Sequence, residues 1–180
     1  MKRFFSFAVL LGLAAQAPFA AAAADGGQAD RKFFHAVEGA WVGPGEIVAG
    51  KYKGTKFNCT FTGSTPQAKV GMTLDGACRV GVFTQKMTAT VERRGAGYAG
   101  TFLDGAGGKG LDVVSGSVKG QKVVFGLNRK QLNGAMLARL ADENTMNVTV
   151  SVKVDDVLVP VIGVSLKRVD GAGVGSIAQE

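Results

Sequence analysis

The sequence is poor in the residues from which most catalytic and metal sites are built. Its 180 residues include one histidine, His35, and two cysteines, Cys59 and Cys78. A single histidine cannot form a multi-histidine metal site, and the sequence identifies no partner for a Ser–His pair. The acidic residues are mostly single, so no pair of carboxylates suggests general acid–base catalysis. We therefore expect neither an enzyme nor a resident cofactor or metal ion.

Long runs of one charge and proline- or serine-rich linkers are also missing. The net charge is +7, but the lysines and arginines are scattered singly or in short groups, so no patch for nucleic acid is indicated. A mild positive charge favours contact with an anionic envelope component, such as lipid headgroups or polysaccharide. The alternative is that these are ordinary solvated charges, because several lie near expected strand ends. Without an internal linker, a chain of this length indicates one domain.

The N-terminus carries a targeting segment. Lys2 and Arg3 precede an apolar run over residues 4–13, which is too short to span a bilayer, and the alanines that follow fit a small-residue cleavage site. We predict a signal peptide over residues 1–24 and export to a bacterial periplasm, with a retained N-terminal anchor as the alternative. No cysteine follows the apolar run closely, so a lipoprotein anchor is not indicated.

A short helix is predicted before the first strand. Asp30 is a suitable N-cap for a helix over residues 31–38, which Gly39 would end. Phe33 and Phe34 would belong to its apolar face. Because a helix this short is unstable alone, it needs a packing partner, for which the mouth of a barrel is suited.

From Trp41 onward the hydrophobic period is two residues. Over residues 145–154, methionine and valine alternate with asparagine, threonine, serine and lysine. Such alternation is typical of antiparallel sheets with one solvated face. Turn signals containing Gly or Asp, including Asp75-Gly76, separate the strand-like runs. The sequence predicts strands near residues 41–50, 55–62, 68–74, 77–84, 85–93, 97–104, 110–118, 121–128, 145–154 and 157–168.

Residues 135–141 fit either a helical turn or a further strand. We favour a strand, because the preceding Asn133 and Gly134 are typical of a hairpin turn. Many short antiparallel strands in one small domain favour closure, which removes exposed sheet edges. The expected fold is therefore all-β: a closed antiparallel up-and-down barrel of about eight to ten strands, with a short N-terminal helix capping one end.

The domain organisation follows from these patterns. The barrel domain is expected over residues 31–169. Residues 25–30 and 170–180 are small and polar, and we expect them to form a loose N-terminal segment and a loose C-terminal tail.

Gly39-Ala40-Trp41, at the start of the first predicted strand, resembles the Gly-X-Trp signature of lipocalins and of the wider calycin group. In those families a short N-terminal segment closes the barrel, and an arginine on the last strand packs over the tryptophan. The resemblance implies a closed barrel with an apolar pocket. It also implies a plug at one end formed by Trp41, Arg168, Phe33 and Phe34, with Arg168 stacked on the indole.

The stretch from Gly39 to Gly45 is also similar to the opening of nitrobindin-type calycins, Gly-X-Trp-X-Gly-X-Gly. Those proteins bind haem through a histidine late in the chain, whereas this sequence has no histidine after His35. We expect His35 to be an exposed or capping side chain. A haem axial ligand at the barrel mouth is the alternative.

Cys59 and Cys78 each lie on the apolar phase of a predicted strand. In an exported protein such a pair indicates a disulfide. A reactive thiol or a metal site is the alternative, but neither a CxxC motif nor a nearby histidine accompanies the cysteines.

The inward phase of the strands defines the candidate ligand-binding residues. Glycines within strands, such as Gly100, Gly116, Gly126 and Gly163, either let coiled strands bend or leave space beside a ligand. The candidate residues are Trp41, Phe57, Phe61, Met87, Phe102 and Phe125.

These features lead to one preferred function and several alternatives. We expect a periplasmic barrel that binds a small apolar ligand, or serves as an envelope accessory protein. The first alternative is a filled structural barrel that contacts an envelope partner or an anionic surface. An outer-membrane barrel and a haem-binding calycin are less favoured. The former needs aromatic girdles, and the aromatic residues here cluster early in the mature chain, so we expect no membrane span.

Overall fold

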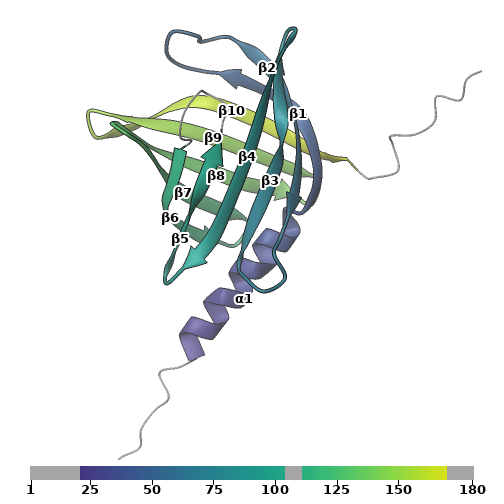
Figure 1. Ribbon diagram of the computed structural model, residues 1–180, viewed down its shortest axis with the longest axis vertical. Helices are drawn as coiled ribbons and strands as arrows, with labels where there is room; N and C mark the ends of the chain where they lie inside the picture. Colours follow the sequence, from purple (N-terminus) through teal and green to yellow (C-terminus); the bar gives the residue numbers. More distant parts are fainter. Residues whose placement is uncertain (1–20, 104–110, 170–180) are drawn as a thin grey trace, which may run out of the picture.

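The computed structural model describes residues 21–103 and 111–169, which form one helix followed by ten strands (Figure 1). Within these residues no helix is both long and apolar enough to cross a membrane. In chain order the elements are α1 (Ala21–Ala36), β1 (Gly39–Ile47), β2 (Lys56–Ser64), β3 (Gly71–Val80), β4 (Phe83–Arg94), β5 (Gly97–Leu103), β6 (Leu111–Lys119), β7 (Lys122–Arg129), β8 (Leu132–Asp142), β9 (Thr145–Val154) and β10 (Val157–Val169).

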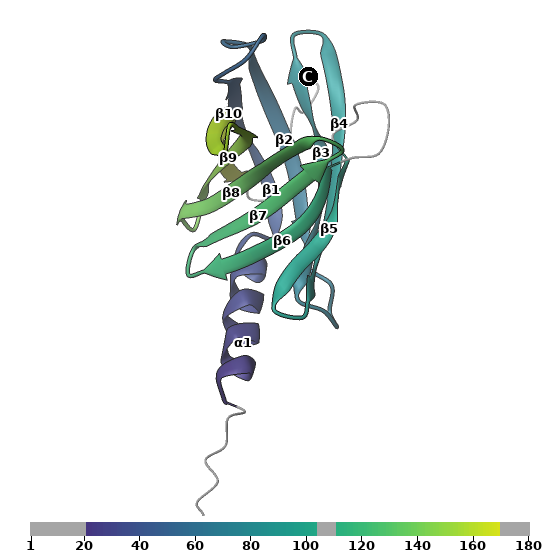
Figure 2. The ribbon, with the colours of Figure 1, turned by 90° about the vertical axis from the view of Figure 1, so that its left-hand side faces the viewer.

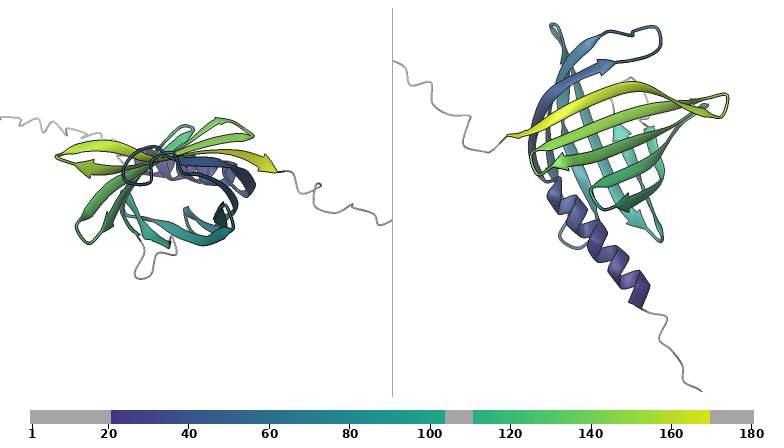
Figure 3. Two further views of the ribbon diagram at one scale, coloured as in Figure 1. Left: turned by 90° about the horizontal axis from the view of Figure 1, so that it is seen from above. Right: turned by 180° about the vertical axis from the view of Figure 1, so that it is seen from behind.

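The ten strands form one closed antiparallel barrel. Each strand pairs with its neighbours in the chain, and β1 also pairs with β10, so the sheet has no free edge. Figure 3 shows the strands arranged around a common axis, in the view from above. The expected closed up-and-down barrel with one N-terminal helix is therefore confirmed.

The two ends of the barrel differ. Helix α1 lies at one end, together with the β2–β3, β4–β5, β6–β7 and β8–β9 connections, and we call this the helix end (Figures 1 and 2). The opposite end carries the β1–β2, β3–β4, β7–β8 and β9–β10 connections, and we call it the far end.

The two-residue alternation along each strand determines which side chains face the interior of the barrel. On β7, Val123, Phe125 and Leu127 are buried, whereas Lys122 before them and Val124 among them are exposed. Successive side chains of a strand point to opposite faces, so one set lines the barrel and the other meets solvent. The core is accordingly assembled from the inward set of every strand, together with the apolar face of α1.

The predicted turn at Asp75-Gly76 is wrong. Both residues lie inside β3, which joins the strands expected over 68–74 and 77–84, and the chain turns instead at Gly81, whose φ is +55°. A Cβ at Gly76 would lie 2.1 Å from the carbonyl oxygen of Thr60 and 2.6 Å from Cδ1 of Phe61. Glycine therefore serves here to let the neighbouring strand approach, not to reverse the chain.

Residues 135–141 form part of β8, so the preference for a strand is confirmed, but the hairpin turn placed at Asn133-Gly134 is wrong. These two residues belong to β8, and the turn lies before them, where Lys130 has a φ of +54°. A Cβ at Gly134 would lie 2.4 Å from the carbonyl oxygen of Ser151 on β9. Again a close approach between strands, and not a turn, requires the glycine.

Helix α1 differs from the helix predicted over 31–38. It includes residues 21–36, so Asp30 lies within it and is not its N-cap, and residues 25–30 are helical, not loose. Gly39, with a φ of +98°, follows the end of the helix by three residues. The alanine-rich sequence favours the longer helix. Residues 1–20 and the tail at 170–180 lie outside the described residues.

Candidate functional site

The helix end is densely packed around Trp41, whose side chain is 0% exposed. Its indole Nε1 donates a hydrogen bond of 3.0 Å to the carbonyl oxygen of Val37, just after α1. Trp41 lies opposite Phe61 on β2 and Arg168 on β10. The tryptophan therefore connects the helix to the two strands that flank β1.

Arg168 holds the same region together from the last strand. Its guanidinium carbon lies 4.3 Å from the centre of the Trp41 ring, within the range of a cation–π contact. Its Nη2 donates to the carbonyl oxygen of Ala36 at 2.8 Å, its Nη1 donates to that of Glu38, and its Nε donates to that of Glu143 at 3.0 Å. Two of these acceptors lie at the C-terminal end of α1, where a helix leaves its last carbonyls without intrahelical partners, and the third lies in the β8–β9 turn.

Aromatic packing completes this end. Phe33 and Phe34 are buried, and the ring of Phe34 lies 5.6 Å from that of Phe33 and 5.4 Å from that of Tyr98. The ring of Tyr98 lies 5.9 Å from that of Phe125. These centroid distances are typical of favourable aromatic pairs. The four residues proposed for a plug thus lie together at the helix end.

Tyr98 is the polar group most deeply involved in this packing. Its hydroxyl donates a hydrogen bond of 2.6 Å to Oδ2 of Asp30, and Nη1 of Arg93 lies 3.5 Å from the same oxygen. Burial raises the pKa of Tyr98 well above its usual range, and the hydrogen bond and charge of Asp30 raise it further. Asp30 therefore attaches α1 to β4 and β5, which explains why it is not a capping residue.

His35 lies on the exposed side of α1. Its Nδ1 lies 3.1 Å from Oε1 of Glu38, which also accepts a hydrogen bond from Thr65. The hydrogen bond from Thr65 holds the pKa of Glu38 below its ordinary value, with a smaller contribution from His35. His35 is therefore an exposed side chain on this outer network. The alternative of a haem axial ligand at the barrel mouth stays a prediction. No group of three or more His, Cys, Asp or Glu residues within 21–103 and 111–169 could hold a metal ion.

Cys59 and Cys78 form a disulfide, as predicted from their number and phase. They lie directly opposite each other on β2 and β3, and both are buried. The Sδ atom of Met87 lies 3.3 Å from Sγ of Cys78. The disulfide therefore forms part of the apolar lining at mid-height in the barrel.

Toward the far end, several inward-facing apolar side chains are only partly buried. Met136 lies opposite the buried Phe125, and Phe102 lies opposite the buried Ala89, so both point inward. Unlike their partners, both are only partly buried. The same holds for Met87, which lies opposite Gly76. We define the far-end lining as Phe57, Met87, Phe102, Leu111, Met136 and Val150, all inward-facing, apolar and partly buried.

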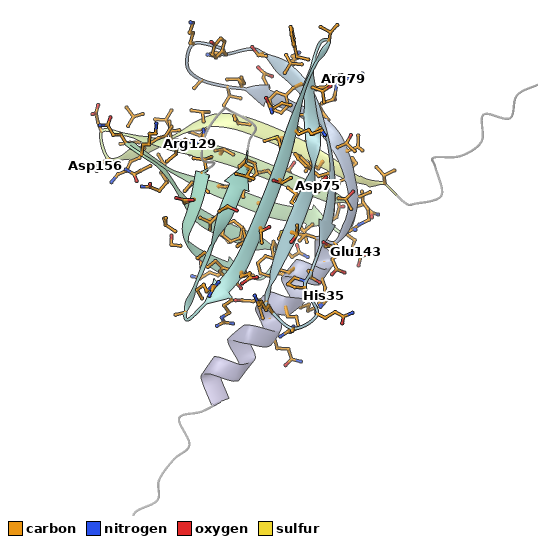
Figure 4. The ribbon with its side chains drawn as sticks, viewed as in Figure 1. His35, Asp75, Arg79, Arg129, Glu143 and Asp156 are labelled. Carbon is orange, nitrogen blue, oxygen red and sulfur yellow. A yellow bond between two sulfur atoms is a disulfide. The ribbon has the colours of Figure 1, made fainter. Side chains whose placement is uncertain are left out.

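Polar residues lie on the same inward face near the rim. Gln85 lies two residues before Met87 on β4, so it points to the same face of the sheet. Arg129, labelled in Figure 4, lies two residues after Leu127 on β7 and likewise shares its face. Atoms Nε and Nη2 of Arg129 are buried. A largely apolar lining with a few polar groups at its mouth is the usual chemistry of a small-molecule site.

The predicted ligand-binding residues divide between the two halves of the barrel. Trp41, Phe61 and Phe125 are fully packed against protein, so they offer no surface to a ligand. Phe57, Met87 and Phe102 belong to the far-end lining. Sequence reasoning omitted Leu111, Met136 and Val150, although the alternation over 145–154 could have indicated Val150. Met136 was missed because its segment had no assigned phase.

The inward glycines mostly serve packing. A Cβ at Gly100 would lie 2.0 Å from the carbonyl oxygen of Thr90, and one at Gly116 would lie 2.6 Å from the ring of Phe125. Both positions are required for close approach, as expected if strand glycines permit tight coiling. They do not leave empty space for a ligand.

No protein-family model and no curated protein matches this sequence. Solved structures do resemble it. The crystal structure of Rv2717c from M. tuberculosis aligns with a TM-score of 0.50 at 11% identity, covering 78% of this chain and 98% of that one. A protein of unknown function from the DUF3598 family of Nostoc punctiforme PCC 73102 aligns with a TM-score of 0.49 at 16% identity. That alignment covers 76% of this chain but only 49% of the Nostoc protein. At such identities, the likeness to Rv2717c establishes a shared barrel fold alone.

Proposed function

We propose that this protein is a calycin-like binding barrel that holds a small apolar ligand against the far-end lining. The observation that carries the proposal is the change in burial along one continuous inward face. Most inward apolar side chains are fully packed at the helix end and only partly buried toward the far end, although both sets point into the barrel. The exceptions are Met72 and Val118, which are partly buried near the helix end, and Leu127, which is buried near the far end. Covering such surface is favourable by about 25 cal/mol per Å².

The chemistry of the lining indicates the class of ligand. The six residues of the far-end lining are aliphatic, aromatic or thioether side chains, which favour an apolar molecule. The outward positions of β9, by contrast, are Asn147, Thr149, Ser151 and Lys153. A lipid-facing barrel needs the reverse polarity, so this pattern weighs against the outer-membrane alternative.

Export to a periplasm remains part of the proposal. It is based on the predicted signal peptide over residues 1–24. The disulfide between Cys59 and Cys78 supports it, because such bonds persist in oxidising compartments.

Ligand binding is tested on the mature protein with a neutral apolar fluorophore, N-phenyl-1-naphthylamine, and by native mass spectrometry of protein from its own host. We expect saturable binding to the protein. Met136→Trp, which adds bulk inside the barrel, should weaken binding at least about tenfold, as loss of buried contact area requires. Leu137→Trp is the matched control, because Leu137 is the next residue on β8 and is exposed.

Urea unfolding of both variants checks that the fold persists, and Val150→Phe replaces Met136→Trp if the latter does not fold. Equal affinity in the inward and outward variants would rule out this site. A protein that binds no probe and carries no co-purified molecule would instead be a filled structural barrel.

A further inference from the structure

The far end presents exposed apolar side chains at the tips of two hairpins. Val82 and Phe83, at the β3–β4 turn, are 89% and 77% exposed, and Tyr52 in the β1–β2 connection is 63% exposed. Figures 1 and 2 show that both hairpins extend beyond the rest of the barrel, on the side opposite α1. Turns usually carry small polar residues, so an exposed Val-Phe pair at a tip is unfavourable unless another apolar phase covers it.

The outer part of each of these two hairpins is rich in positive charge, although Glu46 pairs with Lys56 where the β1–β2 connection begins. Residues 47–56 and 77–87 together contain five basic residues and no acidic one. All five are exposed, and Nζ of Lys51 lies 5.4 Å from the ring centre of Tyr52. Figure 4 shows Arg79 near the tip of the β3–β4 hairpin. The five are Lys51, Lys53, Lys56, Arg79 and Lys86.

We infer that these two hairpin tips dock the protein on the surface of an anionic phospholipid bilayer. Val82 and Phe83 enter the interface between headgroups and acyl chains, and the five basic residues contact the headgroups. Apolar and aromatic side chains beside lysines and arginines are the usual combination for interfacial membrane contact, in which each basic residue near an anionic surface strengthens binding. A protein partner fits less well, because protein interfaces are depleted in lysine.

Docking at this end gives an apolar ligand a path between bilayer and barrel, and this step rests on the proposed function. Phe83, Gln85 and Met87 follow one another on the inward face of β4, from the hairpin tip to the far-end lining. Phe57 of the lining lies on β2, just past the β1–β2 connection. The docked rim therefore opens the lining toward the lipid, which identifies the ligand as a membrane-derived apolar molecule.

The test is co-sedimentation of the mature protein with vesicles at low salt. One set is phosphatidylcholine alone, and the other contains equal amounts of phosphatidylcholine and phosphatidylglycerol. We expect binding to the anionic vesicles and release on adding salt. The double variant Val82→Ser/Phe83→Ser should lose at least about tenfold in partitioning. Val114→Ser is its control, because Val114 is 60% exposed but lies on the barrel wall in β6.

The contribution of the basic residues to vesicle binding is tested with a second pair of variants. Lys51→Gln/Lys53→Gln should lose about tenfold or more, whereas Lys119→Gln/Lys122→Gln, at the helix end, should bind like the wild type. Equal binding by tip and control variants would overturn the inference. Salt-sensitive binding to an anionic polysaccharide without binding to vesicles would also overturn it.

The two proposals can fail separately. The tip variants should still bind the neutral fluorophore in solution, and Met136→Trp should still sediment with anionic vesicles. A wild-type protein that binds the fluorophore but not the anionic vesicles would therefore reject the docking surface alone. The opposite result would reject the ligand site alone.

Discussion

At the scale of single residues, Arg168 illustrates how much one side chain contributes to closing the barrel. It stacks on Trp41 and donates to three backbone carbonyls, on Ala36, Glu38 and Glu143. The planar guanidinium offers five donors in a fixed geometry, which a lysine cannot reproduce. The stacking follows from the family resemblance. The three carbonyl contacts depend on where α1 and the β8–β9 turn end in space, which no local pattern indicates.

Tyr98 is a second single residue with a testable effect, because it makes the free energy of unfolding depend on pH. Its folded-state pKa is raised by burial and by Asp30 above the ordinary value of 10.0. The unfolded state therefore loses its proton first as the pH rises, and the free energy of unfolding falls above about pH 10. Urea unfolding on either side of that pH should show the loss in the wild type and a smaller loss in Tyr98→Phe.

Tyr98→Phe should also lower the free energy of unfolding at neutral pH. Removing its hydroxyl deletes the hydrogen bond of Tyr98 to Asp30 and leaves only the ion pair of Asp30 with Arg93, so we expect a loss of about 1 kcal/mol. Tyr52→Phe, at an exposed position, serves as the control. The same alkaline loss in Tyr98→Phe as in the wild type would contradict the assignment.

At the scale of the elements, close approach between neighbouring strands explains the two misplaced turns. Both Asp75-Gly76 and Asn133-Gly134 have the composition of a turn, and both lie within strands. Local composition cannot distinguish a glycine that reverses the chain from one that admits a neighbouring strand. The distinction requires the register of the paired strand, which is a tertiary property.

Gly76→Ala tests this explanation. The added Cβ would meet Thr60 and Phe61, so the strands must shift, and we expect a loss of about 1–3 kcal/mol in the free energy of unfolding. Gly163→Ala on β10 is the matched control, because a Cβ there would have no neighbour within 4 Å. Urea unfolding followed by Trp41 fluorescence measures both. A Gly76→Ala variant as stable as the control would show that the strands tolerate the side chain.

At the scale of the whole molecule, the two ends of the barrel differ in how completely they are packed. The helix end contains the fully buried aromatic residues, whereas the far end has a partly exposed lining and exposed hairpin tips. Regions with less buried apolar surface are less stable locally, which is compatible with the proposed ligand site at the far end.

The contribution of each end to stability can be compared by removing one phenylalanine ring from each, Phe34 at the helix end and Phe83 at the far end. Phe34→Ala removes a ring that is 1% exposed, and we expect a loss of about 3–5 kcal/mol in the free energy of unfolding. Phe83→Ala should change it by less than about 0.5 kcal/mol. Comparable losses in chemical denaturation would mean that the far-end tips also contribute to the folded core.

The sequence by itself determined the class of fold, the inward and outward sets of most strands, and the disulfide. These properties depend on the two-residue hydrophobic period and on the number of cysteines. Both can be read from the sequence without knowing which strands pair or where the helix packs. Only the tertiary structure decided the extent of α1, the true turns and the division of the inward face into a packed half and a partly exposed half. Alternation shows which side of a strand a residue faces, but not how far along the barrel axis it lies. That position depends on strand register and on where the helix packs.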